Sequence, residues 1–488
     1  MLPRPTTHAK NLQDFDSALF NQSIKITGVC INAQAVKSGD LFIALSGAKT
    51  HGLNFAYEAI KNGAVAILTD KKIDLSIPVF VTENPRSLMG SISAWYYEQP
   101  FHKLLAVGVT GTNGKTTTVN LLKQIWQMAG KTTGVIGTIG TEIAGKSFPG
   151  VRTTPEATEL QAAAALMLEN KVTHLAMEVS SHALAQHRLS GAFFEISAFT
   201  NLTQDHLDFH KNMEDYFLAK SILFREELSK VAVINIDDNY GQRLFDSRPG
   251  NSISVSRLTQ LGHWHFQSIA AKNNGFEITI TNKADDFISG FFPLLGEHNL
   301  DNLIMAVAIA SESGLTSAEI SQAIPQLQSV PGRLQQIKLG QKFNALVDYA
   351  HTPDAVERVL SAARGFTTGK LISILGCGGD RDKGKRPLMG KALSNYSDIA
   401  IFTSDNPRSE SPEQILAEMV DGMEIIKPSA VIVDRRSAID YAVSIAGAGD
   451  SILLLGKGHE IGQEINGITT AFNDVTELSD SIAKALNK

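Results

Sequence analysis

The feature of this sequence that most constrains its fold is a glycine-rich turn between an apolar strand and a helix. The run at residues 104–110, LLAVGVT, predicts a buried strand, and residues 116–130 have the pattern of a helix that ends at Gly130. In such a turn, successive backbone N–H groups and the helix N-terminus bind phosphate. The three elements therefore predict the start of a βαβ unit that binds a nucleoside triphosphate.

The turn supplies the residues that we expect to contact the triphosphate, namely Gly111, Thr112, Asn113, Gly114, Lys115, Thr116 and Thr117. We expect Lys115 to neutralise the β and γ phosphates and the Thr116 hydroxyl to reach a magnesium ion. An ordinary P-loop has its first glycine where this chain has Val109, which argues against a motor protein or a GTPase. A chance glycine turn before a helix is the alternative interpretation.

Strands and helices alternate on both sides of the turn and predict an α/β protein of three domains. A chain of 488 residues allows two to four domains at roughly 100–200 residues each. Residues 1–101 predict a small N-terminal α/β domain. Residues 102–332 predict a P-loop-type parallel sheet with an antiparallel insertion between Ser252 and Phe292, around an NNG turn. After Pro331 and Gly332, residues 333–488 predict a doubly wound, Rossmann-like domain with five apolar strands.

Composition excludes several classes of protein. Hydrophobic residues make up 43% of the chain and charged residues 19%, which is typical of a globular protein. The 44 Lys and Arg against 50 Asp and Glu give a net charge of -6, so no basic field favours nucleic acid. Cys30 and Cys377 are too isolated for a disulfide framework or a thiolate zinc site. Without a signal-peptide core or a long apolar run, we expect a cytoplasmic monomer with no membrane or nucleic-acid partner.

Acidic and imidazole side chains follow two later strands of the predicted central sheet: Glu178, Asp205, His206, Asp208 and His210. Ligands of open α/β sheets bind at the carboxyl ends of strands, so these groups are expected near the phosphates. Any one of them alone would be read as a helix cap or a satisfied polar residue. Together they favour Glu178 and His206 as magnesium ligands, although a carboxylate is the more usual donor.

These segments together resemble the Mur ligase family, the ATP-dependent amide-forming enzymes of peptidoglycan synthesis. The resemblance runs from GTNGKTT through MEVSSHAL, TNLTQDHLDFH, YFLAKSILF, GEHNLDN, VPGR, VDYAHTPDA and DNPRSE to GKGHE, and so covers all three predicted domains. It implies that the N-terminal domain holds the UDP end of the substrate. It also implies that the central domain binds ATP and that the C-terminal domain admits the incoming amino acid.

The resemblance implies roles for individual residues as well. Lys220 matches the lysine that carbon dioxide carbamylates to N6-carboxylysine; its sequence context alone predicts a solvated helix residue. The implied catalytic residues are Lys115, Glu178, His206 and Lys220, and the implied magnesium ligands are Thr116, Glu178, His206 and carbamylated Lys220. Further nucleotide contacts are implied at Asn299, Asn302, Arg333, Asp348 and His351. Contacts to the UDP-muramoyl peptide are implied at Ile31, Ala33, Ala48, Lys49, Thr50, Arg152, Thr153, Thr154, Ser180, Gln186 and Arg188.

One segment departs from the family pattern. The family usually has Asp-Ser-Arg before its GDLF strand, whereas this chain has Asn32-Ala33-Gln34 before residues 39–42. The chain therefore lacks a serine and an arginine on the side expected to contact uridine.

The segment Asp405-Asn406-Pro407-Arg408 is similar to the signature of family members that add meso-diaminopimelate to UDP-N-acetylmuramoyl-L-alanyl-D-glutamate, rather than lysine. A guanidinium can bind a carboxylate through two hydrogen bonds, and meso-diaminopimelate differs from lysine by its distal carboxylate. Arg381, Gly456 and Glu460 complete the implied pocket, where Glu460 can receive an ammonium group. The alternative is that DNPR merely ends a strand in a turn.

The implied reaction uses ATP and Mg²⁺, forms an acyl phosphate and releases ADP. Two other ligase activities are also compatible with the sequence, that of a folylpolyglutamate synthase and that of a lysine-adding Mur ligase. A nucleotide-binding switch without ligase activity is the alternative from another class.

Overall fold

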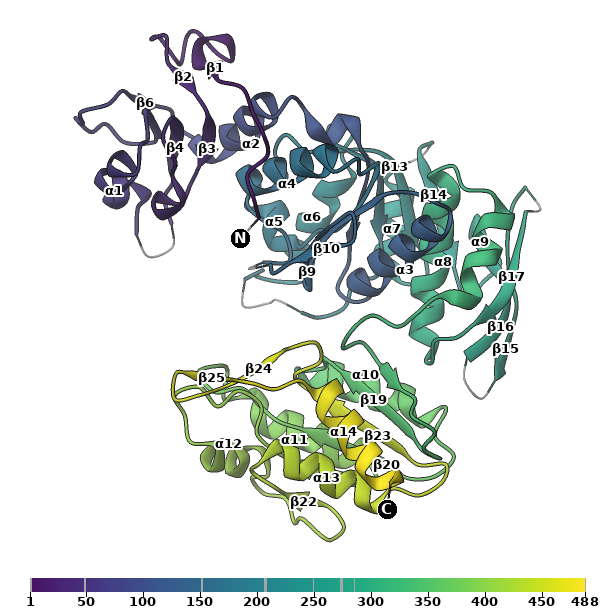
Figure 1. Ribbon diagram of the computed structural model, residues 1–488. Coiled ribbons are helices and arrows are strands. Elements are labelled where there is room, and N and C mark those ends of the chain that lie inside the picture. Colours follow the sequence, from purple (N-terminus) through teal and green to yellow (C-terminus); the bar gives the residue numbers. More distant parts are fainter. Residues whose placement is uncertain are drawn as a thin grey trace. The chain divides into compact units, whose positions relative to one another are not determined.

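The computed structural model describes residues 2–47, 50–150, 152–205, 209–248, 250–272, 275–284 and 286–487. These residues group into two compact units. The first unit consists of residues 1–269, 278–290 and 301–326, and the second consists of residues 270–277, 291–300 and 327–488. Both units contain parallel sheets with helices packed on them (Figure 1). The predicted α/β fold class is confirmed, and the boundaries at residues 101 and 332 stay a prediction.

The N-terminal sheet consists of four parallel strands in the order β3 (Gly28–Cys30), β4 (Asp40–Ala44), β5 (Ala66–Thr69) and β6 (Val79–Val81). Helices α1 (Ala56–Lys61) and α2 (Pro85–Tyr96) belong to the same region. A short pair, β1 (Lys10–Asn11) and β2 (Lys25–Ile26), precedes the sheet. Every residue of β4 is buried, and Asp40 is held there by two hydrogen bonds from Arg4, of 2.7 and 2.6 Å.

The central sheet has eleven strands in the order β10-β9-β8-β11-β7-β12-β13-β14-β15-β16-β17. Their bounds are β7 Leu105–Thr110, β8 Thr133–Gly137, β9 Gly140–Ile143, β10 Lys146–Phe148, β11 His174–Glu178, β12 Phe194–Phe199, β13 Ser229–Asn235, β14 Ser252–Ser256, β15 Trp264–Lys272, β16 Gly275–Asn282 and β17 Phe287–Phe292. The strands from β8 to β15 in this order pair in parallel. The segment expected to form an insertion thus extends the sheet through β14 to β17, and its Asn273-Asn274 turn lies outside the described residues.

The helices of this region are α3 (Lys115–Met128), α4 (Ala157–Glu169), α5 (Ser181–Ala185), α6 (Met213–Ser221), α7 (Asn239–Asp246), α8 (Glu297–Glu312) and α9 (Ser317–Ala323). Met167 of α4 and Tyr216 of α6 pack in one core cluster with Leu175 and Met177 of β11. All five residues of β11 are buried, which is typical of a parallel strand in the centre of a sheet. The helix predicted for residues 116–130 begins at Lys115 and is followed by Gly130, whose φ is +75°.

The C-terminal sheet has the order β18 (Gln335–Ile337), β19 (Asn344–Asp348), β23 (Ser451–Leu455), β20 (Leu371–Leu375), β21 (Ile399–Phe402) and β22 (Ala430–Val431). Its helices are α10 (Pro353–Arg364), α11 (Lys385–Tyr396), α12 (Pro412–Met419), α13 (Arg435–Ile445) and α14 (Asp474–Leu486). Alternate residues of β20 enter two different core clusters, Leu371 with α10 and α11, and Ile372 with α13 and α14. Helices therefore cover both faces of the sheet, as predicted. The antiparallel strand β18 and the hairpin of β24 (Gly462–Ile465) and β25 (Ile468–Ala471) were not predicted.

A fully buried ion pair joins α13 to α14. Arg435 donates to the two oxygens of Asp474 at 2.7 and 2.6 Å, and its Nη2 also donates to the Leu455 carbonyl at 2.9 Å. Removing one partner of such a pair costs about 3–5 kcal/mol, because the other charge stays buried and unpaired. Asp474→Asn should therefore lower the free energy of unfolding by that amount, measured by urea denaturation.

The neighbouring pair of Arg436 and Glu477 provides a matched control between the same two helices, because Arg436 is half exposed. Exposed pairs contribute about 1 kcal/mol or less, so Glu477→Gln should have little effect on the urea midpoint. Equal losses in the two variants would contradict the structural role given to Arg435.

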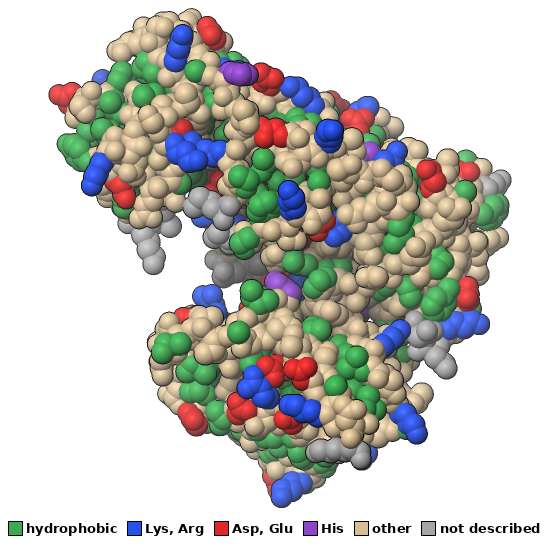
Figure 2. All heavy atoms as spheres, in the orientation of Figure 1, with side chains coloured by type: hydrophobic (Ala, Val, Ile, Leu, Met, Phe, Trp, Pro, Cys, Tyr) green, Lys and Arg blue, Asp and Glu red, His purple; other side chains and the backbone are tan. Residues whose placement is uncertain are grey.

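On the face displayed in Figure 2, basic and acidic side chains are interspersed. Within the described ranges, no helix is both long and apolar enough to cross a membrane.

Candidate functional site

The glycine-rich turn closes tightly at the carboxyl end of β7. Gly111 and Gly114 have φ values of +147° and +87°, which side chains of L-residues rarely adopt. A Cβ atom at Gly111 would overlap the hydroxyl of Thr200, and one at Gly114 would overlap the amide oxygen of Asn302. Both positions thus require glycine, and the turn is held against the end of β12 and against α8.

Two lysines donate to the same carbonyl of the turn. Lys115 and Lys220 each place Nζ 2.8 Å from the Gly111 oxygen, and Lys115 also donates to the Thr112 oxygen at 2.9 Å. Lys220 belongs to α6 and is only 1% exposed. The interpretation of Lys220 as a solvated helix residue is therefore wrong.

The environment of Lys220 favours a neutral amine. Burial, followed by the nearby charge of Lys115, lowers its pKa well below the ordinary value, and Asp205 opposes this shift. The ammonium form loses its hydration in this site, whereas the neutral form has a lone pair available for reaction. Lys220 is thus suited to act as a nucleophile.

Glu178 ends β11, which is the neighbour of β7 in the sheet. Its buried carboxylate accepts hydrogen bonds from the Thr116 hydroxyl at 2.8 Å and from the Thr138 backbone at 2.8 Å. The Thr138 hydroxyl lies 3.2 Å from that of Thr153. The structure thus brings two of the predicted magnesium ligands, Thr116 and Glu178, together at the turn.

Two predicted ligands remain: Lys220, described above, and His206, whose segment is only partly described. His206 and Asp208 lie outside the described residues. The His210 ring has Nε2 2.9 Å from the Ser181 hydroxyl, in a buried position against Tyr216. Within the described ranges, no three His, Cys, Asp or Glu side chains gather as a metal site. The Glu178 carboxylate and the Thr116 hydroxyl are oxygen donors of the kind that magnesium takes, so this donor set fits the ion.

The predicted substrate residues of the central region form one hydrogen-bonded chain. The Thr154 hydroxyl donates to the Glu178 carbonyl at 2.9 Å and accepts from the Ser180 backbone at 3.1 Å. Arg188 donates to the Thr154 carbonyl at 3.1 Å and to the Gln186 amide oxygen at 2.6 Å. These residues are therefore connected through Glu178 to the glycine-rich turn.

The predicted substrate residues of the N-terminal region follow two neighbouring strands. Ile31 and Ala33 come after β3, and Thr50 comes after β4, so all three lie at one edge of the parallel sheet. The Asn32 side chain accepts from the Gln34 backbone at 3.1 Å and caps the 3₁₀ turn Ala33–Ala35. The departure from the family pattern thus forms a local turn. Ala48 and Lys49 lie outside the described residues.

Two asparagines predicted near adenine lie on α8, three residues apart, and both are buried. Asn302 accepts from the Thr118 hydroxyl at 3.4 Å, beside the glycine-rich turn. Asn299 donates to the Leu295 carbonyl at 2.7 Å. Asn302 is thus hydrogen-bonded to the first turn of α3.

The remaining nucleotide residues lie around the end of β19. Asp348 accepts backbone hydrogen bonds from Leu334 at 2.7 Å and Ala350 at 2.8 Å. Burial raises the pKa of Asp348, and the charge of Arg333 opposes the shift. Arg333 lies over the Tyr349 ring at 5.3 Å, and the exposed His351 has Nδ1 2.7 Å from the Tyr349 carbonyl. Arg333, Asp348 and His351 are therefore brought together.

A buried polar network follows β21 and β23 in the C-terminal region. Asn406 donates to Glu460 at 2.7 Å and accepts from Lys457 at 3.0 Å, and Lys457 also donates to Glu460 at 3.1 Å. Lys457 is fully buried and was not singled out by the sequence, although GKGHE contains it. Gly456 has φ +105°, and a Cβ there would lie 2.7 Å from the Asp405 carboxylate, whose pKa burial raises.

Arg408 lies beside this network in a left-handed conformation, with φ +53°. Its Nη1 donates to the Gly379 carbonyl at 2.6 Å, and its Nε is 3.6 Å from Glu464 of β24. A Cβ at Gly378 would lie 2.9 Å from Arg408 Nη1 and 3.8 Å from Arg381 Cγ. The two predicted arginines thus both adjoin Gly378. Glu464 was missed, because the hairpin that carries it was not predicted.

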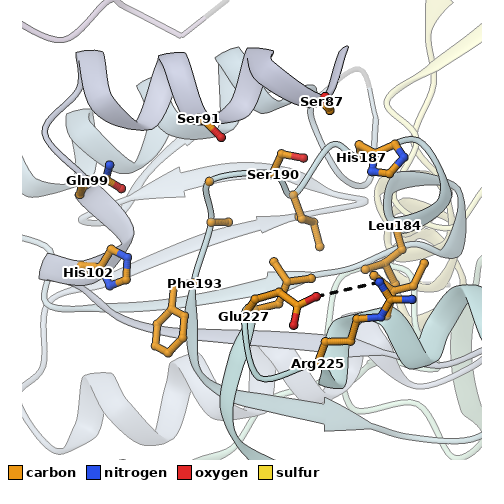
Figure 3. Close-up of a pocket in the computed structure, with 15 residues that line it drawn as sticks. Ser87, Ser91, Gln99, His102, Leu184, His187, Ser190, Phe193, Arg225 and Glu227 are labelled. Carbon is orange, nitrogen blue, oxygen red and sulfur yellow. Dashed lines mark ion pairs between the residues drawn. The ribbon is translucent and has the colours of Figure 1, made fainter. Parts of the chain in front are cut away.

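A separate cavity of about 410 Å³ adjoins α2, the segment 184–193 and the segment 222–228. In it, His102 stacks on Phe193 with ring centroids 5.1 Å apart, and Arg225 pairs with Glu227 (Figure 3). His187 lines this cavity, but its chain neighbours do not. This cavity is therefore not lined by Gln186 or Arg188.

Three family models match this chain. They are "Mur ligase family, catalytic domain" at residues 25–91, "Mur ligase middle domain" at 109–310 and "Mur ligase, glutamate ligase domain" at 332–458. They span most of the chain and cover each of the three predicted domains.

Individual proteins are similar over nearly the whole length. The UDP-N-acetylmuramoyl-L-alanyl-D-glutamate--2,6-diaminopimelate ligase of Streptomyces coelicolor is 41% identical over 476 residues, which cover 95% of this chain and 93% of that protein. A solved structure of a ligase with the same name superposes with a TM-score of 0.72 at 33% identity, over 98% of this chain and 100% of that one. The MurF ligase of Thermotoga maritima, solved in complex with ADP, shares the fold with a TM-score of 0.64 at 18% identity, over 94% and 98% of the two chains.

Proposed function

Because this chain belongs to the Mur ligase family, we propose that it adds meso-diaminopimelate to UDP-N-acetylmuramoyl-L-alanyl-D-glutamate in peptidoglycan synthesis. The reaction uses ATP and releases ADP. The observation that carries the choice of amino acid is the arrangement of side chains after β21 and β23. It places Arg408 and Arg381 beside the buried network of Asn406 and Glu460.

This arrangement suits a substrate with a carboxylate at one end and an ammonium group near the other. The guanidinium of Arg408 pairs with the distal carboxylate of meso-diaminopimelate. Asn406 and Lys457 both donate to Oε2 of Glu460 and so fix the position of this carboxylate, which receives an ammonium group. Lysine, which ends in an ammonium group, leaves Arg408 without its carboxylate partner.

The first chemical step activates the substrate carboxylate. An oxygen of the D-glutamyl γ-carboxylate attacks the γ-phosphorus of ATP, the bond to the bridging oxygen breaks, and ADP leaves with that electron pair. The carboxylate and the phosphate repel each other, so Lys115 must turn to the phosphates and neutralise part of their charge. Magnesium, held by Thr116, Glu178, His206 and the modified Lys220, would supply further charge neutralisation there.

The second step forms the amide bond. The neutral amine of meso-diaminopimelate attacks the acyl carbon, phosphate leaves with the bond electrons, and the new amide nitrogen loses a proton. The residues that hold the two reactants in line account for much of the acceleration. Thr154, Ser180 and Arg188 position the acyl side, and Arg408 and Glu460 position the amine.

Lys220 takes part as a carbamate. Its neutral amine attacks the carbon of CO₂, a C–N bond forms and a proton leaves, which gives a carboxylate on the side chain. The support is its burial beside Gly111 and its lowered pKa. The new anion faces the charge of Lys115 and is thereby stabilised.

Replacing Arg408 by alanine tests the proposed choice of amino acid. Truncating one partner of a buried charge pair costs about 2–5 kcal/mol. The Arg408 side chain is 24% exposed. We therefore expect the lower value, or roughly a 30-fold rise in KM for meso-diaminopimelate. The measurement is ADP release against varied meso-diaminopimelate, L-lysine and L-glutamate, with the two other substrates in excess.

The matched control is Arg364→Ala, because Arg364 forms a half-exposed pair with Asp398 in the same region. It should leave all three KM values unchanged. An equal proportional loss for meso-diaminopimelate and L-lysine in Arg408→Ala would contradict the assignment. Preferred use of L-lysine or L-glutamate by the wild type would favour a lysine-adding ligase or a folylpolyglutamate synthase, respectively.

A further inference from the structure

Glu156 is a buried carboxylate that three arginines surround. It is 5% exposed and precedes α4, where it forms a capping box with Glu159. Its oxygens lie 3.1 Å from Arg86 Nη1, 3.3 Å from Arg152 Nη1 and 3.1 Å from Arg188 Nε. We call these four residues the Glu156 cluster. The buried carboxylate of Glu156 thus contacts three guanidinium groups.

The cluster has more positive than negative charge. Even with the exposed Glu159 included, three guanidiniums face two carboxylates. Burial lowers the pKa of Arg188, the charges of Arg152 and Arg86 act in the same direction, and Glu156 opposes them. An additional anion would therefore be stabilised here, as Coulomb's law requires in a partly buried site.

The cluster lies next to predicted substrate residues. Arg188 donates to the Thr154 carbonyl, and the Thr154 hydroxyl donates to the Glu178 carbonyl. Arg152 directly precedes Thr153 and Thr154 in the chain. Hydrogen bonds and chain neighbours thus connect the arginines of the cluster to the residues that hold the acyl substrate in the proposed reaction.

Arg86 reaches Glu156 because α2 packs against the segment that follows Arg188. A Cβ at Gly90 would overlap the carbonyl oxygen of Ser190, and one at Gly191 would lie 2.6 Å from the Gly90 carbonyl. Arg86 is four residues before Gly90 on α2, so both occupy one face of that helix. The glycine contact therefore sets the position from which Arg86 meets Glu156.

We infer that Glu156 is a positioning residue that holds Arg86, Arg152 and Arg188 as one anion-binding cluster, and that Arg86 contacts an acidic group of the UDP-muramoyl peptide. The inference rests on the proposed function. That substrate carries a diphosphate and carboxylates, and guanidiniums bind both kinds of group through paired hydrogen bonds. Glu156 keeps the three like charges in place until the substrate arrives.

Glu156→Gln tests the positioning role, because glutamine keeps an oxygen for the helix cap and removes only the charge. We expect KM for UDP-N-acetylmuramoyl-L-alanyl-D-glutamate to rise about tenfold, with kcat within about twofold and KM for ATP and meso-diaminopimelate unchanged. Arg86→Ala should raise the same KM. In the double variant the two effects should fall short of additive, since the residues act as one unit.

The matched control is Glu214→Gln, which removes the carboxylate of an exposed pair with Arg243. It should change neither KM nor the unfolding temperature. Glu156→Gln could unfold at a lower temperature than the wild type. In that case Arg86→Lys, which leaves the helix cap intact, replaces it in the test, and KM for UDP-N-acetylmuramoyl-L-alanyl-D-glutamate is measured for that variant. Unchanged KM in both Arg86 variants, or an equal rise in KM for all three substrates, would overturn the inference.

Binding of UDP alone identifies the acidic group. Weaker UDP binding by Arg86→Ala in calorimetry assigns the contact to the diphosphate, whereas an effect confined to the complete substrate assigns it to a carboxylate. A different result would contradict the proposed function itself, namely that the wild-type protein forms no amide with this substrate.

Discussion

Lys115→Ala should lower kcat for ADP release by roughly 10²–10³-fold, the loss typical of removing one charge-stabilising donor. In the structure the Lys115 amine lies on two carbonyls of the glycine-rich turn, 2.8 and 2.9 Å away. Lys115 therefore lies at the turn where we propose that the phosphates of ATP bind. The fold should survive, since the variant keeps both glycines and the start of α3.

Lys123→Ala is the matched control for Lys115→Ala. Lys123 lies two turns further along α3 and pairs with Glu142 at 3.0 Å, away from the glycine-rich turn. It should leave kcat unchanged within about twofold. Near-normal turnover in a folded Lys115→Ala protein would remove the basis of the triphosphate assignment.

Lys220→Ala should be almost inactive, because it removes both the buried amine and the carboxylate that CO₂ would form on it. A short carboxylic acid such as acetate should partly restore ADP release by occupying the vacated space as an oxygen donor. The measurement is kcat against acetate concentration in Lys220→Ala, with Lys115→Ala as the variant that acetate should not restore. A high-resolution structure of active, magnesium-bound protein with an unmodified amine would refute the carbamate.

The same substitution should change the pH dependence of stability. The folded-state pKa of Lys220 is below its unfolded value, so the unfolded chain binds more protons between the two. Lys220 therefore penalises folding increasingly as the pH falls below about 10.4, the ordinary lysine value. Without CO₂, the urea midpoint of the wild type should rise more steeply with pH than that of Lys220→Ala. Parallel profiles would show that the lysine is not buried as described.

Much of the fold could be predicted because the principal strands are continuous apolar runs. The segment around Leu453 is buried on both sides, and such strands are recognisable without any alternation. Strand β18 has three residues, too few for a pattern, and it lies at a sheet edge. Hairpin β24-β25 is largely exposed, so its residues have no apolar periodicity to detect.

The site could be predicted where its residues are close in the sequence or, as for Glu178, follow a strand of the central sheet. Residues 111–117 form a contiguous turn with a recognisable spacing, whereas the contact of Lys220 with Gly111 joins positions 109 residues apart. Family resemblance supplied Lys220, because its residue type normally indicates solvent. Arg86 meets Glu156 across 70 residues. Only the packing of Gly90 on Ser190 explains that contact.

The shared acceptor at Gly111 has a consequence for motion in the turn. When Lys115 swings toward a nucleotide, the Gly111 oxygen keeps Lys220 as a donor. A buried carbonyl left without any donor costs about 1–3 kcal/mol, and the second lysine avoids that cost at Gly111. A carbamate nitrogen still carries one N–H, so modified Lys220 retains the ability to donate. The second donor thus lowers the free-energy cost when Lys115 leaves Gly111. Lys220 therefore stabilises the loop in addition to its role as a reactive group.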